Sequence, residues 1–92
     1  MDEKAVVEFI SQDKKIHVDL EIPLGITAND LVLALNEAYD LGIDTDDIFN
    51  CYLAAENPIV FLRGNKTLKE LGIRNGSHII YRRDQRWNIN TK

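Results

Sequence analysis

The segment IHVDLEIP, residues 16–23, has the strictest alternation of apolar and polar residues in the chain. Successive side chains of an extended strand point to opposite faces, so its aliphatic residues share one face while His17, Asp19 and Glu21 share the other. The closing proline cannot donate a hydrogen bond to a strand ladder and therefore ends the strand. A strand with one apolar face has to belong to a sheet that is covered on that side.

A second alternating run precedes this strand. Val7 and Phe9 alternate with Val6, Glu8 and Ile10. The polar stretch SQDKK separates the two runs, so together they predict an N-terminal hairpin with Val7 and Phe9 facing inward.

Helical spacing begins after the hairpin. Thr27 is a good N-cap, Asp30 follows three residues later, and Gly42 is suited to the position just after a helix. These signals predict a helix over about residues 28–41, with Leu33 among its polar residues. Its predicted apolar face consists of Leu31, Ala34, Leu35, Ala38, Tyr39 and Leu41, with Val32 at the margin.

Three further strands are predicted after the helix. In IFNCYLA, residues 48–54, Phe49, Cys51 and Leu53 should face inward and Tyr52 outward. The inward side of residues 59–62 is not settled by periodicity. The segment TLKELGI predicts a single helical turn capped by a threonine, and RNGS predicts a turn. The last strand should place Ile79 and Tyr81 inward, and His78, Ile80 and Arg82 outward.

The order of these elements predicts an α+β fold. A hairpin, one crossover helix and returning strands give a mixed sheet of four to five strands packed on one α-helix, which is the β-grasp arrangement. The predicted strand order is second, first, last, third, fourth, with the first and last strands central and parallel. With 92 residues there is room for one domain.

The segments TLKELGIRNGSHIIY and EIPLGITANDLVLAL resemble ubiquitin-like domains, and together they are similar to the EsaB/YukD family of small bacterial proteins of type VII (WXG100) secretion. The resemblance covers residues 5–83. It implies a ubiquitin-like domain over residues 1–83, followed by a tail, residues 84–92, that we expect to be flexible. It also implies an accessory or regulatory protein that binds a component of the secretion machinery. Such a protein would be located in the cytoplasm, and a secretion complex could hold it at the inner face of the membrane.

No covalent or catalytic chemistry is expected. Ubiquitin and the sulfur carriers of this fold end in a diglycine, whereas this sequence ends in NINTK, so conjugation is not predicted. No nucleophile with a base and an orienting group can be assembled, which indicates a protein that is not an enzyme and has no cofactor. The acidic N-terminus lacks a secretory signal, no run approaches the length of a membrane span, and one cysteine excludes an internal disulfide.

No metal site is predicted. Asp40, Asp44, Asp46 and Asp47 lack the spacing of a calcium-binding EF-hand, so an acidic capping loop is the preferred interpretation. The two histidines should lie on strands separated by one intervening strand, with no evident third ligand.

The candidate binding site is the sheet face opposite the helix. An exposed apolar cluster there, rimmed by Glu8, would mark a surface for a protein partner, although single exposed apolar residues are common on any protein. We expect a monomer or weak dimer. The candidate partner-binding residues are Val6, Ile10, Tyr52, His78, Ile80 and Arg82, with Trp87 of the tail as a further anchor if it does not cover the chain's own apolar surface.

The alternative function is that of a nucleic-acid-associated regulator. Arg82, Arg83 and Arg86 beside Trp87 could hold a single strand by charge and stacking. Against this stand the net charge of −4 and the pI near 5.0, since three arginines on an acidic chain give a weak positive field. Nucleic acid is therefore the less favoured partner.

Overall fold

The computed structural model of the chain describes residues 3–47 and 49–82 and forms one mixed sheet with one helix. The elements, in chain order, are β1 (Lys4–Ser11), β2 (Ile16–Pro23), α1 (Ala28–Tyr39), β3 (Leu53–Glu56), β4 (Val60–Leu62) and β5 (His78–Ile80). The predicted tail, residues 84–92, lies outside the described residues.

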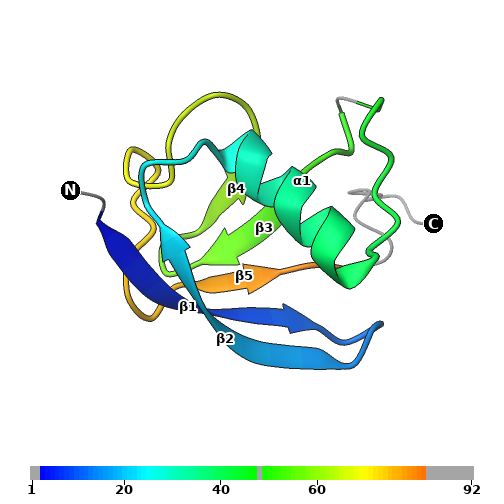
Figure 1. Ribbon diagram of the computed structural model, residues 1–92, viewed down its shortest axis with the longest axis horizontal. Coiled ribbons are helices and arrows are strands. Elements are labelled where there is room, and N and C mark those ends of the chain that lie inside the picture. Colours follow the sequence, from blue (N-terminus) through cyan, green and yellow to red (C-terminus); the bar gives the residue numbers. More distant parts are fainter. Residues whose placement is uncertain (1–2, 48, 83–92) are drawn as a thin grey trace.

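The sheet has the order β2-β1-β5-β3-β4, as the sequence predicts (Figure 1). The central strands β1 and β5 run parallel, and the other neighbouring pairs are antiparallel. The α+β fold and its topology are thus confirmed. The two edges of the sheet are β2 and β4.

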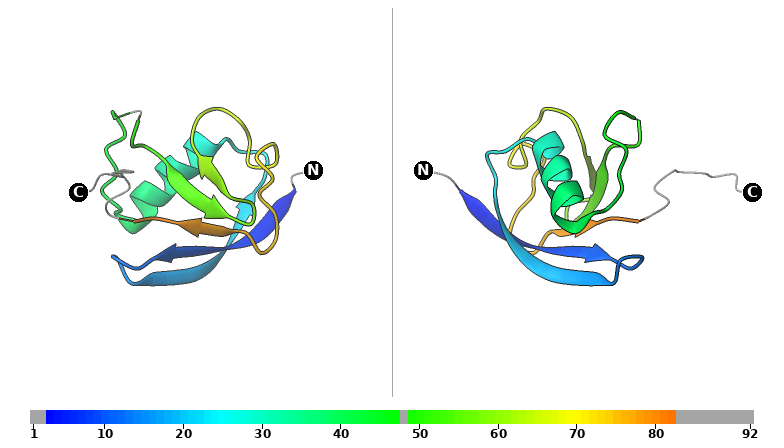
Figure 2. Two further views of the ribbon diagram at one scale, coloured as in Figure 1. Left: turned by 180° about the vertical axis from the view of Figure 1, so that it is seen from behind. Right: turned by 45° about the vertical axis from the view of Figure 1, so that its right-hand side comes forward.

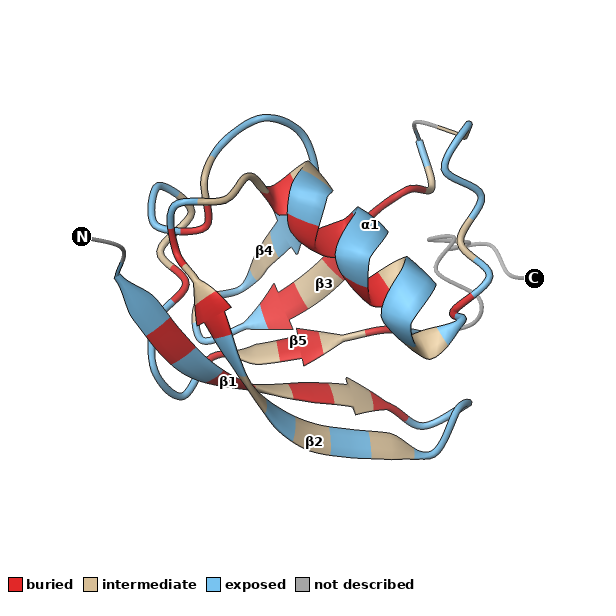
Figure 3. Cartoon of the chain, viewed as in Figure 1, coloured by how far each residue is buried: buried red, intermediate tan, exposed pale blue. Residues whose placement is uncertain are grey.

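The helix covers one face of this sheet, and among residues 3–47 and 49–82 no helix lies on the opposite face, which we call the bare face. The view from behind shows β3 and β4 in front of α1 (Figure 2). The core lies between the two layers, where the buried stripes of the helix and strands face each other (Figure 3). Phe9, Leu62 and Ile79 are fully buried there. Each such side chain contributes about 1.5–3 kcal/mol through removal of apolar surface from water.

The helix begins as predicted and ends earlier. The Thr27 hydroxyl accepts the backbone N–H of Asp30 at 3.1 Å, which caps the first turn. The helix ends at Tyr39 and not at 41, because Asp40 takes the left-handed conformation expected for Gly42. The side chain of Asn36 then binds the backbone N–H and C=O of Ile43, which directs the chain away from the helix axis.

The buried stripe of the helix is also rotated relative to the prediction. Ala34 and Ala38 are exposed, whereas Val32 is fully buried. Branched and long aliphatic side chains bury more apolar area than alanine, so they decide which side of the helix packs on the sheet. Leu33 is exposed, as expected. The buried residues of α1 are Ala28, Leu31, Val32 and Leu35.

The third strand starts later than predicted. Phe49 is 75% exposed and its N–H donates to the carboxylate of Asp47 at 3.1 Å, so the chain makes a turn where the sequence indicated a strand. Cys51 and Leu53 are buried, as predicted. Hairpin pairing between β3 and β4 settles the direction of the fourth strand, which turns Leu62 inward and Phe61 outward.

The connection to the last strand is a capped turn. The Thr67 hydroxyl accepts the N–H of Glu70 at 3.1 Å, and the Glu70 carboxylate accepts the N–H of Thr67 at 2.8 Å. Leu68 is fully buried beneath this turn. Gly76 has a φ of 89° and donates its N–H to Val6, which aligns β5 beside β1.

Candidate binding face

The bare face of the sheet carries an apolar row that crosses four neighbouring strands. The register places Ile10 opposite Ile80, Ile80 opposite Ala54, and Ala54 opposite Phe61. Directly paired side chains on one face have Cβ atoms about 4.5–5.5 Å apart, so the four are in reach of their neighbours. These four residues, Ile10, Ile80, Ala54 and Phe61, form the apolar row.

A polar row runs parallel to the apolar row, two residues along each strand. The register places Asp19 opposite Glu8, Glu8 opposite His78, and His78 opposite Glu56. The carboxylate of Glu8 lies 3.1 Å from Nε2 of His17 and 2.8 Å from Nε2 of His78. Nδ1 of His78 is 3.8 Å from the Glu56 carboxylate. The polar row, Asp19, Glu8, His78 and Glu56, therefore borders the apolar row with acidic groups.

Val6 does not join the apolar row. It is 48% exposed, but it lies four residues from Ile10 along β1, about 13 Å away by strand rise, with the polar row between them. The structure thus brings Ile10 and Ile80 together and separates Val6 from both.

Tyr52 contacts the outward-facing Phe61, on the side of the sheet that was predicted for it, but it is buried. Only 5% of it is exposed, so its expected exposure on this face is wrong. Tyr52 precedes β3, and its ring packs edge-on against Phe61, with centroids 5.3 Å apart and planes at 70°. Tyr52 supports Phe61, which extends the apolar row to the edge strand.

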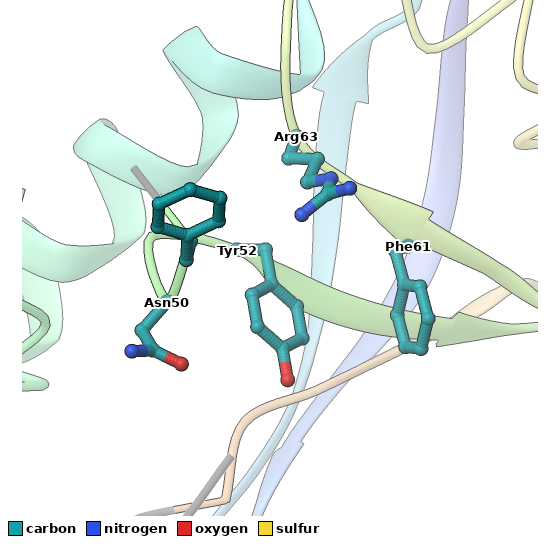
Figure 4. Close-up of a pocket in the computed structure, with 5 residues that line it drawn as sticks. Asn50, Tyr52, Phe61 and Arg63 are labelled. Atoms are coloured by element: carbon teal, nitrogen blue, oxygen red, sulfur yellow. The ribbon is translucent and has the colours of Figure 1, made fainter. Parts of the chain in front are cut away.

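An aromatic hollow adjoins this end of the face. Its volume is about 140 Å³, and Tyr52 stands between Asn50 and Phe61 in Figure 4, with Arg63 beside them. The aromatic hollow is lined by Phe49, Asn50, Tyr52, Phe61 and Arg63.

One acidic residue, Asp47, contacts the lining of the aromatic hollow. The Asn50 side-chain amide donates to the Asp47 carboxylate at 2.8 Å, and this hydrogen bond is the main reason that the pKa of Asp47 is lowered. The carboxylate of Asp44 accepts the N–H of Asp46 at 3.0 Å. These aspartates cap the loop before β3, and Asp47 stays ionised at neutral pH.

Several residues of the face were not found from the sequence. Phe61 is 46% exposed, Ala54 lies between two apolar neighbours, and Phe49 lines the hollow. The ambiguous alternation of residues 59–62 concealed Phe61, and its direction follows from the hairpin register. Arg82 is exposed at the end of the described chain. Trp87 lies outside the described residues.

Ser77 and Cys51 are both buried in the described chain. Ser77, the one hydroxyl near a histidine in the sequence, is fully buried; it donates to the carbonyl of Asn57 at 2.6 Å and accepts the N–H of Arg74. Burial raises the pKa of the Cys51 thiol, with smaller contributions from Asp44 and Asp47. Within residues 3–47 and 49–82, no three histidine, cysteine or acidic side chains are grouped to hold a metal ion.

The described helix has 12 residues, whereas a helix that crosses a membrane takes about 20 apolar ones. No helix within the described residues meets that requirement.

Solved structures share this fold. The ubiquitin-like domain of tubulin-binding cofactor B superposes with a TM-score of 0.69 at 23% identity, covering 89% of this chain and 91% of that domain. The C-terminal ubiquitin-like domain of mouse tubulin-specific chaperone e gives a TM-score of 0.67 at 12% identity, covering 88% and 87%. At these identities the likeness shows the ubiquitin-like fold alone. No curated protein matches the sequence.

The family is shown by the sequence itself. Residues 6–80 match the family described as WXG100 protein secretion system (Wss), protein YukD. This span runs from the first strand of the sheet to the last residue of β5 and includes every helix and strand between them. The chain therefore belongs to the YukD family of ubiquitin-like WXG100 secretion system proteins.

Proposed function

We propose that this protein is a non-catalytic accessory or regulatory component of its secretion system that binds a protein partner non-covalently through the bare sheet face. The partner in this proposal is another component of the WXG100 machinery, on the cytoplasmic side of the membrane. Family membership supports the assignment to a WXG100 secretion system. The geometry of the bare face supports non-covalent protein binding as the mode of action.

The apolar row carries this proposal. Ile10, Ile80 and Ala54 lie in neighbouring strands of the sheet, and Phe61 extends the row to an edge. Interfaces combine such an apolar centre with a polar rim. Glu8, His78 and Glu56 provide that rim on one side, so the face suits a partner with apolar side chains flanked by basic ones.

Charge makes nucleic acid a poorer fit to the same face. Asp19, Glu8 and Glu56 would approach the phosphates of a nucleic acid from the polar row. Nucleic-acid affinity comes largely from cationic contacts with phosphate, which these carboxylates oppose.

The test is affinity purification from a bacterium that carries the chain and its secretion genes. The Ile80→Asp and Phe61→Asp variants should lose a co-purifying component of the WXG100 machinery identified by mass spectrometry, and should impair export of a WXG100 substrate. Phe61 lies on an edge strand, so its variant tests the face with less risk to folding. Leu33→Asp, an exposed leucine of α1 on the other side of the sheet, is the matched control.

Retention of the same component by both face variants, with folding verified by circular dichroism, would contradict the face assignment. Loss of binding in Leu33→Asp alone would move the interface to the helix.

A further inference from the structure

We propose that β2 is a contact surface between two copies of this chain, whose β2 strands pair antiparallel about a two-fold axis at Val18 and join the two sheets into one. The inference rests on the backbone groups of this edge strand and on the order of charges along it. It does not depend on the proposed function, because it uses the edge of the sheet and not the apolar row.

The backbone of β1 bonds to its two neighbours in alternation. The N–H of Glu8 donates to the carbonyl of Ser77, and the carbonyl of Val6 accepts the N–H of Gly76. These even-numbered residues of β1 therefore turn their backbone groups toward β5 and the turn before it. In a paired strand such groups alternate between the two sides, so Phe9 and the other odd-numbered residues of β1 turn toward β2.

The register carries this alternation into β2. Phe9 pairs with Val18, so the backbone groups of Val18 and of every second residue from it bond to β1. The residues between them turn their N–H and C=O groups to the outer edge of the sheet, where Figure 1 shows β2 at the margin. Among the described residues, no backbone hydrogen bond reaches these groups. They belong to His17, Asp19 and Glu21.

This strand lacks several of the features that keep edge strands from pairing. Such strands are commonly short, bulged, interrupted by proline or marked by a charge on their covered side. β2 has eight residues that pair with β1 without a bulge, and its proline comes last. Its helix-side residues Ile16, Val18 and Leu20 are aliphatic. By contrast, β4 at the other edge has three residues.

The helix covers β2 less completely than β1. Phe9 of β1 is 0% exposed, whereas Ile16, Val18 and Leu20 of β2 are half-buried. Pairing about Val18 places the two Val18 side chains beside each other, and Ile16 beside Leu20 of the second copy. Because these contacts remove apolar surface from water, they favour association.

The charges of β2 fit this register. The outward backbone groups of two antiparallel strands meet only where odd-numbered residues of one copy face odd-numbered residues of the other. With Val18 on the axis, His17 lies opposite Asp19 of the second copy, and Lys15, in the preceding turn, comes opposite Glu21. Basic and acidic side chains that face each other across a strand pair stabilise it.

Moving the axis by one residue loses this match. With Asp19 on the axis two aspartates meet, and like charges directly opposite each other destabilise a strand pair. With His17 on the axis two histidines meet, and Glu21 comes opposite Asp13. The arrangement of basic residues before acidic ones along β2 therefore favours a second copy with the axis at Val18.

Sedimentation and hydrogen exchange of the full chain test the pairing together. The mass should rise from the 10.5 kDa of one chain toward twice that value between about 10 μM and about 1 mM, because a contact between two strands is small. Over the same range, exchange of the amides of His17 and Asp19 should slow at least about fivefold. The amides of Val18 and Leu20, which bond within the chain, should exchange slowly at every concentration.

Asp19→Pro removes an outward N–H without removing a bond between β1 and β2, since the backbone of residue 19 does not bond to β1. It should raise the dissociation constant at least about tenfold, because the N–H is lost from both symmetric pairs. Asp19→Ala keeps this N–H and should have a smaller effect. Circular dichroism verifies that both variants fold.

A charge exchange tests the register and stands even if Asp19→Pro unfolds. Glu21→Lys should weaken the dimer about tenfold by placing two basic residues opposite each other, and Lys15→Glu together with Glu21→Lys should restore it. The matched control is Glu37→Lys, an equal change of charge on an exposed residue of α1, which should leave the dissociation constant within about twofold.

A mass of one chain throughout the concentration range would overturn the proposal. So would a dimer in which the amides of His17 and Asp19 exchange as fast as in the dilute chain, since the copies would then associate through another surface. Protection of these amides at every concentration without a change in mass would overturn it as well, because the edge would be covered within one chain. An equal loss of association in Glu37→Lys and Glu21→Lys would show that net charge decides, and not the pairing of β2.

Discussion

Glu8 and His78 lie opposite each other where the two central strands run parallel, and a carboxylate oxygen of Glu8 is 2.8 Å from Nε2 of His78. The other oxygen of Glu8 is 3.1 Å from Nε2 of His17 on β2. One carboxylate thus joins three strands on the bare face. All three side chains are at least one third exposed, so water competes with each of these contacts.

Glu8→Ala is therefore expected to change the free energy of unfolding by less than about 1 kcal/mol, the usual size of an exposed ion pair. Its neighbour Phe9 points to the core and is fully buried. Phe9→Ala should cost about 3–5 kcal/mol through lost burial and the cavity left behind. Urea unfolding of the two variants measures both values. A loss of several kcal/mol in Glu8→Ala would show that the polar row is part of the stabilising core.

Asn36 has a structural role that its position on the polar side of the helical wheel does not reveal. Its side chain accepts the N–H of Ile43 at 2.9 Å and donates to the carbonyl of the same residue at 3.1 Å. Asn36→Ala should lower the free energy of unfolding by about 1–3 kcal/mol, because two half-buried backbone groups lose their partner. Glu37→Ala, one residue on and exposed, should stay within about 0.5 kcal/mol. Equal midpoints of thermal unfolding for the two variants would show that the Asn36 side chain does not stabilise this connection.

Alternation and helical spacing predicted most of the fold. Residues 16–22 and 78–81 carry a period of two, and a one-residue slip would turn every apolar side chain to water, so their inward faces follow directly. The strand order followed from the crossover helix and the central parallel pair. The outward direction of the half-buried pair Ile10 and Ile80 could be predicted for the same reason.

The part of the face near β4 could not be predicted, because local hydrogen bonds decide it. Asp47 binds the N–H of Phe49 and makes a turn, which removes Phe49 from the strand that its alternation indicated. The hairpin register then turns Phe61 outward. In a run of four apolar residues, the sequence does not show which of the two alternating sets of side chains is buried. The complete burial of Leu62 shows that its side of the strand faces the core.

The Thr67–Glu70 cap predicts a dependence of stability on pH. The N–H and the hydroxyl of Thr67 lower the pKa of Glu70 from its ordinary value of 4.5. A lowered pKa in the folded state means that the stabilisation is present above pH 4.5 and is lost as the pH falls through the lowered value. Glu70→Gln should therefore be less stable than the unsubstituted chain at neutral pH, and the difference should shrink in acid. Thermal unfolding from pH 7 to pH 3 tests this, and a difference that grows in acid would contradict the cap.

Cys51 should react slowly while the protein is folded. Its side chain is 6% exposed, and burial raises the pKa of its thiol from the ordinary value of 9.0, with Asp44 and Asp47 adding to the shift. The thiolate is the reactive form, so both burial and the raised pKa slow alkylation. At pH 8 iodoacetamide should modify the native chain more slowly than the chain unfolded in urea, with Cys51→Ala as the blank. Equal rates of alkylation in the presence and absence of urea would show that this part of the core opens readily. The raised pKa also means that the contribution of the neutral thiol to stability is present below pH 9.0 and is lost as the pH rises above it.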